Sequence, residues 1–297
     1  MQSTSCYRTD GCRLTRCDRR PLTASSVYLA DVEKMIVHID VIKRVSKSRN
    51  KGSILFVHGV CHNATCWHNY LDYFSAAGFD AYALSLRGHG NSDGREFLDQ
   101  WGLSDYVTDV VKIALSFDEK PIIVGHSMGG AIVQKILGEE KSILRAAVLL
   151  APAVKGGLTL SWKLKRFKNH FVKSLKFAKI VHGRSPTEKE IKSSLFLDDR
   201  LDMEQVRVLA PNIQAESKRA QRDLTLEYTP YYDSQNTPVL VIGSKADLLF
   251  PEEDLISTAK AYGTSPIILE KMCHDMMIDP EWERGAIEIE KFAERVL

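Results

Sequence analysis

A serine between two glycines is the part of this sequence best suited to nucleophilic chemistry. Residues 125–129 fit the pattern G-x-S-x-G, with Ser127 at the centre. Where a buried strand precedes this pattern and a helix follows it, the serine lies on a sharp turn that exposes its hydroxyl. The apolar residues 121–124 and the helix-like residues 128–137 provide that context. We therefore expect a nucleophile elbow shaped by the neighbours Gly125, His126 and Gly129.

A serine hydroxyl is a weak nucleophile until a base removes its proton, and His274 is the expected base. It follows the apolar run 266–269 and precedes the last predicted helix, which is the place of the base in the chain order Ser, Asp or Glu, His. A carboxylate must then hold the imidazole in one tautomer. Asp247 follows the apolar run 238–242 and so lies at the same sheet edge as the serine. Asp275 is the weaker alternative, because adjacent loop residues seldom aim their side chains at each other.

Two backbone N–H groups are expected to hold the oxyanion of the tetrahedral intermediate. One belongs to Met128, directly after the nucleophile, and the other to Val60, in the loop after the first buried strand. Each such donor is worth about 10²–10³-fold in rate. Gly59 lets the backbone turn there, and His58 is expected to brace this loop rather than to react. Two more residues of the loop are expected at the mouth of the site: Cys61 and His62.

The elements that must position these residues follow a regular alternation. Strands are expected at 54–57, 81–84, 121–125, 146–151, 238–243 and 266–269, and helices at 67–77, 103–116, 128–137, 252–261 and 281–296. Two earlier strands, at 27–31 and 34–45, predict a meander. Short apolar runs alternating with helices predict an α/β fold with a mostly parallel, eight-stranded sheet covered by helices on both faces.

The two alternating series predict one catalytic domain with an insertion. We expect the core to comprise residues 23–151 and 238–297. Residues 152–237 are mostly helical in pattern and are expected to form a cap or lid over the carboxyl ends of the strands, where open parallel sheets place their ligands. Residues 1–22 are expected to be a disordered tail, with an Arg-rich mitochondrial transit segment as the alternative.

Composition argues against several classes of protein. Forty basic and thirty-eight acidic side chains leave a net charge of +2, so no nucleic-acid partner is expected. The six cysteines form no C-x-x-C pair and show no zinc-finger spacing, so we expect free thiols in the cytoplasm and neither a metal nor another cofactor. No run of about eighteen apolar residues occurs, so no membrane span is expected.

Residues 151–183 are strongly cationic, with eight lysines and arginines and no acidic residue. Apolar residues recur at helical spacing within this stretch: Leu164, Phe167, Phe171, Leu175 and Ala178. The pattern predicts a basic amphipathic helix. The favoured interpretation is a cap helix whose apolar stripe covers the pocket and whose lysines are solvated. The alternative is peripheral contact with an anionic membrane that delivers a lipid-like ester.

The ordered set of motifs resembles the α/β-hydrolase superfamily, and most closely its lysophospholipase, monoacylglycerol lipase and carboxylesterase group. The motifs are residues 57–60, 78–82, 87–92 and 125–130, together with Asp247 and His274. The resemblance covers residues 27–297. Ser85 departs from the pattern, since many relatives carry an aspartate there, but it is away from the triad. A serine at position 127 argues against the dehalogenase and epoxide-hydrolase branches, which carry an aspartate.

The residues and the resemblance together predict a serine hydrolase that cleaves a small-molecule or lipid-like carboxylic ester through an acyl-enzyme on Ser127. Other acyl chemistry on the same fold is the first alternative: a thioesterase, a lactonase, a carbon–carbon hydrolase or an acyltransferase. A non-catalytic ligand-binding protein is the second. Such proteins typically lose a member of the triad, whereas this chain has all three candidates.

Overall fold

The computed structural model describes residues 37–47, 50–139, 143–154, 156–159, 164, 168–226 and 237–297. His38–Leu297 forms one compact unit. The expected tail, 1–22, and the first expected strand, 27–31, lie outside the described residues.

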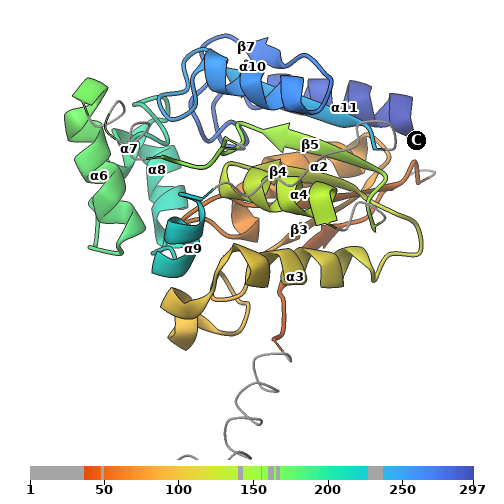
Figure 1. Cartoon of the computed structure of the whole chain (residues 1–297), viewed down its shortest axis with the longest axis horizontal. Helices are drawn as coiled ribbons and strands as arrows, with labels where there is room; N and C mark the ends of the chain where they lie inside the picture. The colour runs from red at the N-terminus through yellow and green to blue at the C-terminus, as the bar shows by residue number, and fades with distance from the viewer. Residues whose placement is uncertain are drawn as a thin grey trace, which may run out of the picture. The chain divides into compact units, whose positions relative to one another are not determined.

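A seven-stranded sheet forms the centre of this unit (Figure 1). Its strands are β1 (Val41–Arg44), β2 (Ser53–Val57), β3 (Asp80–Leu84), β4 (Ile122–His126), β5 (Ala146–Leu150), β6 (Val239–Ser244) and β7 (Ile267–Leu269). They lie in the order β1-β3-β2-β4-β5-β6-β7. Only the β1–β3 pair is antiparallel in the described part of the sheet. The mostly parallel sheet is confirmed. Of the strand expected at 34–45, the described part contains the short strand β1, while the strand expected at 27–31 lies outside the described residues.

Burial explains why the central strands are continuous apolar runs. Every residue of β4 and of β5 is buried, and so are the last four residues of β2. Parallel strands covered by helices on both faces have no solvent face on which polar residues could alternate.

Helices cover both faces of the sheet. They are α2 (His68–Ala76), α3 (Leu103–Ala114), α4 (Met128–Glu139), α10 (Glu252–Ala261) and α11 (Glu283–Val296), with the short 3₁₀ helices η1 (Ala64–Trp67) and η2 (Arg95–Gln100). On one face, α2 and α11 share a hydrophobic core with Phe56 and Val124. On the other face, the Val133 side chain of α4 packs against Gly125, and α10 packs against Gly243.

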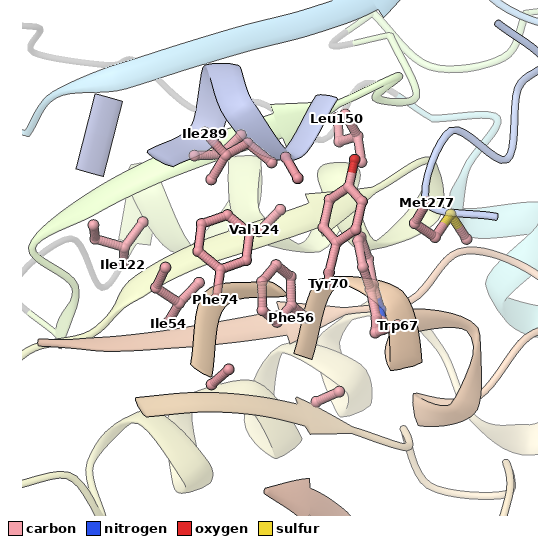
Figure 2. Close-up of a cluster of buried hydrophobic side chains, with 14 of the residues drawn as sticks. Ile54, Phe56, Trp67, Tyr70, Phe74, Ile122, Val124, Leu150, Met277 and Ile289 are labelled. Atoms are coloured by element: carbon pink, nitrogen blue, oxygen red, sulfur yellow. The ribbon is translucent and has the colours of Figure 1, made fainter. Parts of the chain in front are cut away.

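Aromatic side chains of η1 and α2 hold the loop after β2 in place. The ring of Phe56 lies 4.9 Å from that of Trp67, 5.9 Å from that of Tyr70 and 5.6 Å from that of Phe74, centre to centre. Figure 2 shows these rings packed together with Ile289 of α11 close by. Aromatic pairs of this kind add about 0.5–1.5 kcal/mol beyond the burial of their area. The chain between β2 and α2 is therefore anchored at both ends.

Four further α-helices have described bounds between β5 and β6 in the chain. They are α6 (Phe171–Val181), α7 (Glu188–Lys192), α8 (Met203–Leu209) and α9 (Lys218–Asp223), with the 3₁₀ helix η4 (Ala210–Asn212) before α9. Capping boxes start two of them, Thr187 with Glu190 at α7 and Asp202 with Gln205 at α8. In Figure 1 these helices gather at one side of the sheet. We call residues 171–223 the α6–α9 segment. Of the helices described, none has the length and apolar character needed to cross a bilayer.

Candidate active site

Ser127 is the single residue between the end of β4 and the start of α4. Its φ of +51° lies in the left-handed region, which costs a non-glycine residue about 1–3 kcal/mol. Two glycines make the sharp turn feasible. A Cβ on Gly125 would lie 2.3 Å from the carbonyl oxygen of Gly129, and a Cβ on Gly129 would lie 2.3 Å from that of Val57. The turn therefore has the strained geometry that a nucleophile elbow requires.

The loop after β2 abuts this turn. A Cβ on Gly59 would lie 2.8 Å from Nδ1 of His126 and 3.0 Å from the Cβ of Ser127, so a larger residue there would force a neighbouring side chain to shift. Val60 and Met128 line the same cavity as the serine. Within the described ranges, the backbone N–H groups of Val60 and Met128 donate to no protein acceptor. Both N–H groups thus remain available to bind an oxyanion.

His274 and Asp247 form a buried hydrogen-bonded pair. The Nδ1 atom of His274 donates to Oδ2 of Asp247 over 2.8 Å, and both side chains are fully buried. The other carboxylate oxygen, Oδ1, accepts from the backbone N–H groups of Leu249 at 2.7 Å and Phe250 at 3.1 Å. The carboxylate is therefore oriented from both sides, and the imidazole is held with its proton on Nδ1.

The free nitrogen of His274 is placed to act as a base. Its Nε2 atom is buried and has no partner among the described residues, so no hydrogen bond to Ser127 is formed. Catalytic hydrogen bonds of this kind are often long until substrate binds. Burial alone would lower the pKa of His274, but the charge and hydrogen bond of Asp247 outweigh burial, and the pKa is raised. A raised pKa strengthens the imidazole as a proton acceptor.

His126 connects the elbow to the histidine loop. Burial lowers its pKa to about 3, so the ring is neutral, and its Nε2 atom donates to the carbonyl oxygen of His274 over 3.0 Å. The two rings lie 4.8 Å apart, centre to centre. The sequence pattern places His126 in the elbow, but only the fold shows that it also holds the loop of His274.

Asp275, the alternative carboxylate, is occupied elsewhere. Its Oδ2 atom lies 2.9 Å from Nε2 of His62, and both side chains are buried. Burial alone would raise the pKa of Asp275, but the charge and hydrogen bond of His62 lower it by more. The expectation that Cys61 and His62 line the mouth is wrong. Both are buried and neither contacts the cavity, because His62 turns inward to pair with Asp275.

His58 has the contacts of a structural brace. Its Nδ1 atom donates to the carbonyl oxygen of Gly59 over 2.8 Å, and its Nε2 atom accepts from the N–H group of Leu86 over 3.0 Å. Burial lowers its pKa well below the usual value, so the ring stays neutral. His58 thereby ties the loop after β2 to the loop after β3.

One cluster of titratable groups has spacing that a metal could use. Potential ligand atoms of His126, His274 and Asp275 lie within 4.8 Å of one another. Each residue is already engaged, with the His274 carbonyl, Asp247 and His62 respectively. Among the described residues, one further atom of each side chain has no hydrogen-bond partner, namely Nδ1 of His126, Nε2 of His274 and Oδ1 of Asp275, so these hydrogen bonds alone do not exclude a metal.

A cavity of about 310 Å³ opens beside Ser127. One wall is the inner face of α6, formed by Ser174, Phe177, Ala178 and Val181 at helical spacing. Phe250 lines the cavity too, and its ring lies 5.3 Å from that of His274. The lining is mainly apolar, which suits a hydrocarbon chain next to the serine.

The expected apolar stripe of the basic helix is not the face that covers this cavity. Leu164, Phe171 and Leu175 expose 59%, 51% and 50% of their surface, and of the described stripe residues only Ala178 lines the cavity. Phe167 lies outside the described residues. All three lysines of α6 bind residues of α7 or of the loop after it, and these contacts hold the helix in its observed rotation: Lys173 to Asp198, Lys176 to Ser193 and Lys179 to Glu190.

Comparison with known proteins identifies a family and a fold. The family model described as serine aminopeptidase, S33, matches residues 48–281. A monoacylglycerol lipase from Mycolicibacterium smegmatis is 35% identical over 109 residues, which are 35% of this chain and 39% of that protein. Methylesterase 3 from Arabidopsis thaliana is 27% identical over 128 residues, 41% of this chain and 49% of that protein. The chain thus spans less than half the length of these curated relatives.

A solved structure extends the likeness over most of the chain. Rv0554 from Mycobacterium tuberculosis matches with a TM-score of 0.68 at 19% identity, covering 87% of this chain and 94% of that one. At this identity the match shows the fold alone. The fold is that of the α/β-hydrolases, as expected from the ordered motifs.

Proposed function

The chain belongs to the serine aminopeptidase S33 family of α/β-hydrolases, and from that premise we propose that it is a serine hydrolase of carboxylic esters. The observation that carries the proposal is the buried pair of His274 and Asp247. Its imidazole has the proton on Nδ1 and an unpartnered Nε2. A general base needs such a lone pair, and the Asp247 carboxylate on the opposite nitrogen of the ring holds the tautomer that provides it.

The proposed reaction is acyl transfer to water. Ser127 gives its proton to Nε2 of His274 as its Oγ atom attacks the ester carbonyl, and the N–H groups of Val60 and Met128 hold the oxyanion. The leaving alcohol then takes the proton from His274. Water, deprotonated by the same imidazole, hydrolyses the acyl-enzyme and frees the serine. Asp247 keeps the imidazole in one tautomer and stabilises its positive charge throughout.

The cavity supports a substrate with a short or medium acyl chain. Its 310 Å³ lies at the lower end of the roughly 300–1,000 Å³ found for small-molecule sites. Ester hydrolysis is also the activity named for the monoacylglycerol lipase and the methylesterase that the chain resembles. Thioester, lactone or carbon–carbon hydrolysis and acyl transfer to an alcohol use the same residues and remain the alternatives.

A series of p-nitrophenyl esters tests both the activity and the size argument. We expect kcat/KM for the butyrate and octanoate esters to exceed that for palmitate by tenfold or more, because even one methylene too many costs about tenfold or more in a tight pocket. Steady-state kinetics give the ratio. A preference for palmitate would contradict the size argument. No turnover, together with no labelling by a fluorophosphonate, would favour a ligand-binding protein instead.

We also propose that residues 152–237 form a cap on a core of 23–151 and 238–297. The contribution of α6 to the cavity wall supports this division. The outer face of α6 presents Phe171, Val172 and Leu175, each at least half exposed, and Lys168 nearby is exposed. Apolar residues beside cations suit the surface of an anionic membrane. We therefore propose peripheral contact through this outer face.

Vesicle co-sedimentation tests the membrane contact. The Phe171→Ser and Leu175→Ser variants should bind vesicles containing anionic lipid about tenfold more weakly, since each loses roughly 1.5 kcal/mol or more of apolar burial. Val208→Ser is the matched control, because Val208 is a highly exposed apolar residue on α8 rather than α6. Added salt should weaken wild-type binding. Binding that ignores both lipid charge and salt would rule out the proposal.

A further inference from the structure

A short linker carries contacts from the α6–α9 segment to the loops beneath it. Residues 213–217, between η4 and α9, form this linker. The backbone N–H group of Gln214 donates to the carbonyl oxygen of Cys61 over 2.9 Å, and its side-chain oxygen accepts from Gly90 over 3.1 Å. The N–H group of Glu216 donates to the carbonyl oxygen of Val181, at the end of α6, over 3.0 Å. The linker therefore joins the cavity wall to the loops after β2 and β3.

The side chain of Glu216 is the centre of these contacts. It is fully buried, and its two carboxylate oxygens have four partners within hydrogen-bonding distance. Oε2 is 3.3 Å from the N–H nitrogen of Cys61 and 3.1 Å from Nε2 of His89. Oε1 accepts from the hydroxyl of Tyr106 over 2.9 Å and from the N–H group of Ser217 over 2.8 Å. A buried carboxylate is stable only with such complete pairing.

The carboxylate is held ionised at this position. Burial alone would raise the pKa of Glu216, but the charge and hydrogen bond of His89 and the donors around it outweigh burial, and the pKa is lowered. No side chain with a single acceptor oxygen could serve all four donors. The pairing therefore depends on a carboxylate and not only on the shape of the residue.

Cys61 connects this carboxylate to the oxyanion site. It directly follows Val60, and its φ of +67° is in the left-handed region, which a cysteine adopts only under constraint. The constraint comes from the linker, since Glu216 binds the N–H group of Cys61 and Gln214 binds its carbonyl group. Holding the peptide between Val60 and Cys61 restricts the ψ rotation of Val60, and this rotation orients that peptide relative to the one that carries the Val60 N–H group.

We propose that Glu216 is a positioning residue that sets the Val60 N–H group for the oxyanion, so that the α6–α9 segment completes the oxyanion hole as well as the cavity wall. This inference rests on the proposed function. Glu216 touches neither Ser127 nor His274 directly in the described structure. Its effect on the reaction passes through the backbone of the loop after β2. Replacing a residue with this role should destabilise the transition state more than the bound substrate.

The Glu216→Gln variant tests this role, because it keeps the shape but leaves an amide facing the N–H group of Cys61. We expect kcat for p-nitrophenyl butyrate to fall about 10²-fold, the effect of losing one oxyanion donor, with KM little changed. A trifluoromethyl ketone, which forms an oxyanion with the serine, should lose affinity by the same factor as kcat/KM. The corresponding secondary alcohol, which forms none, should bind as to wild type. Glu204→Gln, at an exposed position on α8, is the matched control and should behave as wild type.

The Tyr106→Phe variant provides a second test if Glu216→Gln folds poorly. It leaves the carboxylate in place and removes one of its donors. The ketone should again lose affinity while the alcohol does not, and kcat should fall by a smaller factor than in Glu216→Gln. Loss of ketone and alcohol affinity by equal factors would show a merely structural role and overturn the proposal, as would an unchanged kcat in Glu216→Gln. Failure of the wild type to hydrolyse any ester would instead overturn the proposed function, and the positioning role with it.

Discussion

Replacing Ser127 with alanine is expected to abolish hydrolysis of p-nitrophenyl butyrate, with a loss of about 10⁶-fold in kcat, as found when the nucleophile of a comparable triad is removed. The reason is that alanine has no hydroxyl with which to form the acyl-enzyme. The fold should persist, since alanine occupies the same left-handed turn with one atom fewer and leaves both flanking glycines in place.

Two measurements complete this experiment. Circular dichroism and thermal unfolding should match the wild type, and a fluorophosphonate probe should no longer label the protein. Ser116→Ala, at an exposed position beyond the end of α3, is the matched control and should keep full activity and labelling. Retained turnover in the Ser127 variant would remove this residue from the proposed mechanism.

The Asp247→Asn variant is expected to lower kcat by about 10⁴-fold, the loss seen when the carboxylate of a serine triad becomes an amide. An amide at this position can donate to Nδ1 of His274 and so favours the wrong tautomer, with the proton on Nε2. Steady-state kinetics at one pH measure the loss. Asp118→Asn, at an exposed position after α3, should leave the rate unchanged. An unchanged rate in the Asp247 variant would point to another acid.

The pH profile of the same variant gives an independent check. His274 must be neutral to act as a base, so the wild-type rate falls as pH drops through its pKa. Asp247 raises that pKa by its charge and its hydrogen bond. Removing the charge should therefore lower the pKa and move the acid limb of the residual activity to lower pH. A shift to higher pH would contradict the electrostatic role of Asp247.

Local patterns predicted the strands and helices of the core closely. The helix expected at 252–261 is α10 with the same bounds, and the strand expected at 121–125 is β4, shifted by one residue. These elements are readable because parallel strands buried on both faces must be apolar throughout, and because glycines flank the turn at Ser127. The expected position of the base also follows from chain order alone.

The α6–α9 segment has a feature that local sequence patterns did not predict correctly, the rotation of α6. Periodicity identified a helix there but gave the wrong inner face, since Phe171 and Leu175 point outward while Ser174 and Phe177 line the cavity. A short helix that is apolar on more than one side has no face preferred by its own sequence. Its rotation depends on partners elsewhere, such as Glu190, which binds Lys179.

The sequence by itself determined the class of fold, the order of the core elements and the edge of the sheet at which Ser127, Asp247 and His274 lie. Tertiary structure alone decided that His62 turns inward to Asp275 and that Glu216 reaches Cys61 across 155 positions of the chain. The physical reason is the range of the forces. Backbone geometry and burial produce a periodic pattern of apolar residues along the chain. A buried hydrogen bond between distant residues produces no such pattern.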